Sequence, residues 1–115
     1  MNETPYAYFD GFDYPLDMPS DGILSRTILD TSSIRFVLFY FAAGQELSEH
    51  TTAFPAIIHI LEGDARLELG GETKDAHQGS IAYMAAGLRH AVFAQTSVVM
   101  LLQLIKCQHL KDERS

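Results

Sequence analysis

The sequence of 115 residues contains one cysteine, no tryptophan and few basic residues. A single cysteine cannot form an internal disulfide or a cysteine-rich zinc site, so neither stabilises this fold. Only 8 Lys and Arg stand against 15 Asp and Glu, which gives a net charge of −7. This balance argues against binding to nucleic acid or to an anionic membrane, because both require clustered basic residues. No apolar run approaches the roughly 18 residues of a membrane span.

The N-terminal segment, residues 1–22, is acidic and aromatic. It holds five carboxylates, no Lys or Arg, and three of the four prolines. Proline at this density disfavours a helix, and the aromatic residues are too many for a solvated tail. We predict an extended arm that packs its rings on its own barrel or on a second subunit. The segment has neither the basic start nor the apolar run of a signal peptide, which predicts a cytoplasmic protein.

Residues 23–106 read as one all-β domain, followed by a polar tail over 107–115. Turn residues recur about every 8–12 positions, which is typical of an antiparallel sandwich or barrel. Gly70-Gly71 predicts a tight hairpin. The spacing over 23–29 also fits a short helix, although Thr27 and the flanking turn residues favour a strand. The expected strands cover 23–29, 34–41, 56–61, 65–69, 72–76, 80–84, 89–94 and 98–105.

Two expected strands are apolar on both faces. Residues 34–41 carry Arg35 as their one charge, and residues 98–105 carry Gln103 as their one polar side chain. A sheet with one face in water should alternate, so both faces of these strands should be covered. In so short a barrel the second cover is most simply another subunit, which predicts a homodimer.

Two segments carry glycines and histidines at fixed spacing. Gly44, His50 and Gly63 match the motif G-x5-H-x-H-x3,4-E-x6-G, and the second segment matches G-x5-P-x-G-x2-H-x3-N. Over most of residues 34–105 the sequence therefore resembles the small single-domain cupins (cupin type-2, RmlC-like). The anchors of the second motif are Gly79, Gly87 and His90.

The resemblance implies a jelly-roll antiparallel β-barrel (a double-stranded β-helix) of six to eight strands, often dimeric. It also implies one divalent transition metal, such as Fe, Zn, Mn, Ni or Cu, held by three His and one Glu. Of these ligand positions His50 and His90 are kept, but Thr52 and Ala56 occupy the other two. The motif proline and asparagine are replaced by alanines 85 and 94. Half of the usual ligand set is therefore missing.

Strand alternation places the remaining side chains. If position 56 faces the barrel interior, His59 points outward and cannot replace a lost ligand. Glu49 should also face away, unless a bulge intervenes. These parities predict an apolar pocket with His50 and His90 at its mouth. Its expected lining is Thr52, Ala56, Ile58, Ile60, Val92 and Ala94.

Several functions fit such a site. The first is binding of a small organic molecule, with His50 and His90 touching it as acid–base groups or sharing a metal. The second is a metal-dependent enzyme of the oxygenase or isomerase type, whose sites usually hold three or four protein ligands. The third is a non-catalytic sensor or a dimeric interaction module with a decayed site. Fold alone does not decide among them.

Other reactive residues carry weaker patterns. His77 lies in an expected turn and His109 in the polar tail, so both are expected on the surface. Cys107 has no neighbouring base or catalytic motif. Arg89 should face outward near the barrel mouth, where it meets either a ligand carboxylate or a surface acid.

Overall fold

Nine β-strands make up the described part of the chain. The computed structural model describes residues 5–12 and 20–106. Within these ranges it contains no helix, and so none that is long and apolar enough to cross a membrane. The strands are β1 (Ile23–Asp30), β2 (Ile34–Phe41), β3 (Glu46–His50), β4 (Ala56–Glu62), β5 (Ala65–Leu69), β6 (Glu72–Ala76), β7 (Ile81–Met84), β8 (His90–Ala94) and β9 (Val98–Ile105).

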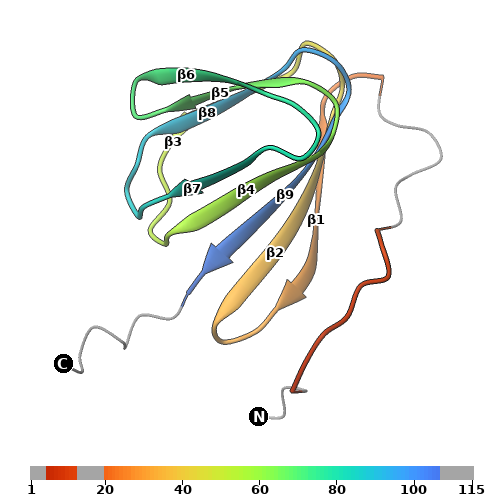
Figure 1. Ribbon diagram of the computed structural model, residues 1–115, viewed down its shortest axis with the longest axis vertical. Helices are drawn as coiled ribbons and strands as arrows, with labels where there is room; N and C mark the ends of the chain where they lie inside the picture. The colour runs from red at the N-terminus through yellow and green to blue at the C-terminus, as the bar shows by residue number, and fades with distance from the viewer. Residues whose placement is uncertain (1–4, 13–19, 107–115) are drawn as a thin grey trace.

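The strands form two antiparallel sheets that face each other, as a jelly roll requires. One sheet has five strands in the order β1-β2-β9-β4-β7, and the other has four in the order β3-β8-β5-β6. In Figure 1 the four-stranded sheet lies above the five-stranded one, and β6 and β7 lie on the same side of the two layers. The predicted all-β jelly-roll fold is confirmed.

All eight expected strands are present, and the structure adds a ninth, β3. This strand was missed because its sequence, Glu-Leu-Ser-Glu-His, has no β-branched or aromatic residue. β3 forms a strand because it pairs with β8, although its own residues do not favour a strand. The hairpin between β5 and β6 turns at Gly70-Gly71, as predicted, and both residues have positive φ, 59° and 94°.

The main core fills the space between the sheets. Alternate residues of each strand point inward, so β4 buries Ala56, Ile58 and Ile60 while His59 lies on the outer side. This confirms the predicted parity of β4. The same core cluster includes Phe41, Leu67, Met84, Val92, Ala94 and Met100.

A second core cluster lies outside the five-stranded sheet. Leu38 and Tyr40 of β2 and Val99 and Leu101 of β9 are at most 6% exposed there. Phe12 of the N-terminal arm packs against this cluster. Both faces of β2 and β9 are therefore covered at this cluster, as expected, and these four side chains are already buried within the single chain.

The N-terminal arm uses its own barrel for part of its packing. The ring of Phe9 lies 5.6 Å from that of Phe12 and 6.4 Å from that of Phe36 on β2, measured between centroids. Of the two alternatives for the arm, packing on its own barrel is thus present at Phe9 and Phe12, while Tyr6 and Tyr8 are exposed. The remainder of the arm over 13–19 and the expected tail over 107–115 lie outside the described residues.

The motif glycine Gly63 lies in close contact with the backbone of Ser97. Gly63 follows β4 with a φ of +92°, and a Cβ atom there would collide with the carbonyl oxygen of Ser97. The next residue is held in the same turn, because the Asp64 amide donates to Thr96 Oγ1 at 2.9 Å. Only glycine meets both conditions without strain, which explains this anchor of the motif.

Candidate functional site

The two histidines of the motifs meet across the pair β3–β8. His50 and His90 are direct partners in the register, and their ring centroids lie 4.3 Å apart with the planes tilted by 57°. His90 is only 3% exposed, whereas His50 is exposed to solvent. The sequence prediction that these two residues lie on facing strands is confirmed. They give one end of the barrel a buried and an exposed imidazole in contact.

Hydrogen bonds orient both rings in the same way. The Nδ1 atom of His50 lies 2.8 Å from the Ser48 carbonyl oxygen, and that of His90 lies 3.0 Å from the Leu88 carbonyl oxygen. A carbonyl oxygen only accepts hydrogen bonds, so Nδ1 carries the proton in each neutral ring. Each Nε2 then presents a lone pair. For His90, no protein group in residues 5–12 and 20–106 hydrogen-bonds this buried Nε2.

A β-bulge turns His50 toward the inner face of the sheet, beside His90. The register pairs Leu47 with Val92 and His50 with His90, so Ser48 and Glu49 together stand opposite one residue, Ala91. Leu47 packs on the main core. Without the extra residue, strict alternation would turn either Leu47 or His50 outward. The bulge therefore lets both side chains face inward.

Glu49 faces outward despite this bulge. Its Oε1 atom lies 3.7 Å from the Nη1 atom of Arg89, and both side chains are more than half exposed. The predicted orientation of both residues is confirmed. Arg89 pairs with a surface acid, which was one of its two predicted roles.

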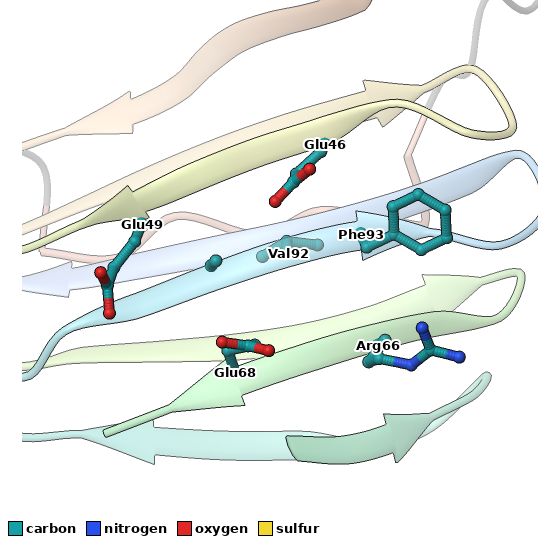
Figure 2. A pocket seen from close by; sticks show the side chains of 7 residues that line it. Glu46, Glu49, Arg66, Glu68, Val92 and Phe93 are labelled. Carbon is teal, nitrogen blue, oxygen red and sulfur yellow. The ribbon is translucent and has the colours of Figure 1, made fainter. Parts of the chain in front are cut away.

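A shallow groove occupies the outer face of the four-stranded sheet. It has a volume of about 320 Å³, and Figure 2 shows glutamates from β3 and β5 on either side of β8. Ala91 and Phe93 form its floor, and the guanidinium of Arg66 lies 5.9 Å from the centre of the Phe93 ring. The histidine pair lies on the opposite, inner face of the same sheet.

A second cavity, of about 350 Å³, lies between the edge strands β6 and β7. Leu67, Leu69, Ala76 and Ala82 contribute to its wall, and Lys74 lies at its rim. No local sequence pattern predicts this cavity, because it depends on the strand order that brings these residues together.

The cupin family profile matches residues 37–104. The chain belongs to the cupin domain family. This match covers both histidine motifs and all strands from β3 to β8. No curated protein matches the chain.

Solved structures share this cupin fold along most of its length. A conserved protein of unknown function from Streptococcus pyogenes has a TM-score of 0.73 at 27% identity, with 91% of this chain and 99% of that chain covered. An RmlC-like cupin from Desulfovibrio desulfuricans has a TM-score of 0.74 at 21% identity, covering 86% and 98%. Salicylate 1,2-dioxygenase from Pseudoaminobacter salicylatoxidans has a TM-score of 0.70 at 14% identity, covering 73% of this chain and 25% of that one.

The usual cupin metal site is not reproduced by the residues of this chain. At the second histidine position, the Thr52 hydroxyl donates to the Phe54 carbonyl oxygen at 2.8 Å. At the glutamate position, Ala56 is fully buried and has no donor atom. Across residues 5–12 and 20–106, no three His, Cys, Asp or Glu side chains are grouped to hold an ion. Two imidazoles alone do not fit a protein-held transition metal, which usually takes three or four protein ligands.

The residues expected to line an apolar pocket are buried in the main core cluster. Ala56, Ile58, Ile60, Val92 and Ala94 are each at most 1% exposed and lie in one cluster. Thr52 is half-buried at the end of the barrel, where its carbonyl oxygen accepts from the Gly87 amide at 2.9 Å. That these residues line a ligand pocket stays a prediction.

The remaining candidate residues lie away from the histidine pair or outside the described residues. His59 is on the outer face of the five-stranded sheet, beside Leu101, as predicted. His77 is exposed in the turn before β7, also as predicted. Cys107 and His109 lie outside the described residues.

Proposed function

We propose that this cupin binds a small organic molecule at the end of the barrel where His50 and His90 meet. One observation carries the proposal. His90 is a buried imidazole whose Nδ1 is fixed by Leu88, while its Nε2 has no hydrogen-bond partner among the described residues. A buried polar atom without a partner costs about 1–3 kcal/mol, so a bound molecule that donates to it would recover that cost.

The two imidazole rings have different roles in binding. His90 is held by its burial and its Nδ1 contact, so it presents Nε2 in a fixed direction. His50 is in contact with solvent, so it can exchange a proton with water. A ligand with an O–H or N–H group would donate to the Nε2 of His90, and a second such group would donate to the Nε2 of the adjacent His50. This is a binding site with the groups for acid–base chemistry.

The test is a screen of small neutral and acidic molecules by thermal shift. A ligand that binds only the folded chain raises its Tm by mass action. We expect compounds whose shift is lost in His50→Ala and kept in His77→Ala, an exposed histidine away from the pair. Shifts that are equal in wild type, His50→Ala and His90→Gln would overturn the proposal, as would a broad screen with no shift at all.

The metal-dependent oxygenase or isomerase is the alternative that this screen must exclude. The similarity to a dioxygenase extends to the fold, while the donor set lacks two ligands. We expect protein purified without added metal to contain far less than one Fe, Mn, Ni, Zn or Cu per chain. Stoichiometric metal that disappears in a His50→Ala, His90→Ala double variant would favour the enzyme instead.

We also propose a homodimer as the working form. The arm and β1 expose large apolar side chains, with Tyr6 and Tyr8 each 76% exposed and Leu24 51% exposed. Light scattering at micromolar concentration should give twice the chain mass of 12.8 kDa. A mass equal to one chain would end this part of the proposal. A cytoplasmic location stays a prediction from the sequence.

A further inference from the structure

The cavity between β6 and β7 has the features of a second binding site. These strands are consecutive in the chain, yet β6 ends the four-stranded sheet and β7 ends the five-stranded one. Figure 1 shows the two strands on one side of the barrel, at the edges of different layers. The cavity of about 350 Å³ opens there, which is within the usual size range of small-molecule sites. We call it the β6–β7 slot.

Two alanines keep the slot open. Ala76 pairs with the buried Ala65, and Ala82 pairs with the buried Ile58, so both face the inside of the barrel. Other inward positions of this core hold large side chains such as Leu67 and Ile58 as well as alanines, but Ala76 and Ala82 lie on the two strands that border the cavity. The small side chains of the two edge strands leave the inner faces of Leu67 and Leu69 as an apolar wall.

Lys74, Asp75 and Ser80 are the polar residues that border the slot, and Lys74 among them is a cation. Lys74 pairs with Leu67 in the register, so its side chain leaves β6 on the inner side, toward the slot. Its Nζ atom lies 3.7 Å from the Oε1 atom of Glu72, and the two side chains are 62% and 75% exposed. Such an exposed pair is weak and can be exchanged for another partner. Asp75, which also borders the slot, pairs with Arg66 at 3.8 Å.

We propose that the β6–β7 slot binds small carboxylates with an apolar body. The body lies against Leu67, Leu69 and Ala82, and the carboxylate takes the place of Glu72 on Lys74. This site goes beyond the proposed function, because its charged group is Lys74 on β6 and not the histidine pair. The two sites are neighbours across β5, since Leu69 borders the slot and is the register partner of His90 on β8.

A series of three probes with the same chain tests the charge selectivity of the slot. Octanoate, octan-1-ol and octylammonium share an apolar body but carry negative, zero and positive charge. In titration calorimetry we expect octanoate to bind most tightly and octylammonium most weakly. Equal affinities for octanoate and octylammonium would overturn the role of Lys74, and no binding of any of the three would overturn the site.

Three variants then locate the probe. Lys74→Gln should weaken octanoate about fivefold and leave octan-1-ol unchanged, as expected for loss of an exposed charge pair. Glu72→Gln removes the competing carboxylate and should strengthen octanoate about twofold. Ala82→Leu fills the slot, so it should weaken both probes at least about tenfold. Both charge variants alter exposed side chains, so their Tm should match that of wild type.

One further variant separates this site from the histidine pair. His50→Ala should leave the affinity for octanoate unchanged if octanoate occupies the slot. If octanoate is lost in His50→Ala and kept in Ala82→Leu, the slot proposal is wrong and the probe occupies the site of the proposed function. If Ala82→Leu fails to fold, the opposite effects of Lys74→Gln and Glu72→Gln still decide the outcome.

Discussion

The two sheets of this barrel share one inner core but have opposite outer faces. Outside the five-stranded sheet, Leu38 and Leu101 are as deeply buried as core residues, and Phe12 of the arm packs against their cluster. Outside the four-stranded sheet, Glu46 and Glu68 are exposed beside a shallow groove. Apart from bulges in β1, β3 and β4, the strands of both sheets alternate, so the kind of residue that points outward largely decides which face packs against protein and which meets water.

This difference shows what the aromatic arm contributes. A single small barrel has one core between its sheets, and its size limits how much apolar surface it can bury. The arm contributes Phe12 to a second cluster on the far side of β2 and β9, and residues 5–12 add no strand. Truncating an outward side chain should therefore lower the free energy of unfolding strongly on the five-stranded sheet and hardly at all on the four-stranded sheet.

The largest expected effect follows Leu38→Ala. Leu38 is 0% exposed, so its truncation leaves a cavity and should cost about 2–5 kcal/mol in the free energy of unfolding. The matched change on the other outer face, Glu68→Ala, should stay within about 0.5 kcal/mol. Urea unfolding at pH 7 measures both. A similar cost for the two variants would remove the distinction between the faces.

A smaller effect is expected for the arm. Phe12 is half-buried against the outer cluster, so Phe12→Ala should cost about 1 kcal/mol of unfolding free energy. Tyr8 is 76% exposed on the same arm, and Tyr8→Ala serves as the control with no measurable change. If Phe12→Ala behaves like the control, the arm does not stabilise the barrel through its contact with the outer cluster.

The smallest effect concerns charge at the edge of the covered sheet. The Lys106 ammonium, 2.7 Å from Asp30, and then the Arg35 guanidinium hold the pKa of the Asp30 carboxyl below its ordinary value of 3.8. A depressed pKa in the folded state gives stability that is present above the unfolded pKa and lost as pH falls through the folded one. Asp30→Asn should therefore lower the Tm slightly at pH 7, and the difference should vanish well below about pH 4.

The matched control for this effect lies on the other sheet. Asp75 pairs with Arg66 at 3.8 Å, and its side chain is 85% exposed. Asp75→Asn should change the Tm less than Asp30→Asn at pH 7. Calorimetric scans of the three proteins between pH 2 and pH 7 decide the point, and a Tm difference for Asp30→Asn that is independent of pH would contradict the ion-pair explanation.

The sequence alone was enough for the fold because the strand signals are local. β-branched and aromatic runs marked eight strands, and the glycines of the two motifs marked the turns between them. The strand β3 escaped notice, because Glu46–His50 has no such signal and is ordered by its neighbour. A local pattern cannot reveal a strand whose stability comes from its pairing.

The candidate site was predictable in part. Motif spacing brought His50 opposite His90, and alternation placed Ile58 and Val92 inside the barrel. Whether the space between such inward residues is empty depends on side chains from the facing sheet, such as Met100, and not on parity. The β6–β7 slot escaped prediction for the same reason, because it depends on two strands that are not paired with each other.

The bulge in β3 also decides which side chain of this strand lies beside His90. In the observed register His50 lies beside His90, with Glu49 on the outside. If the strand straightened by one residue while Leu47 kept its place, Glu49 would lie opposite His90 and His50 would face water. The same backbone would then set a carboxylate against the buried imidazole instead of a second imidazole. A shift of one residue in the register would thus exchange an imidazole for a carboxylate beside His90, without any change in the sequence.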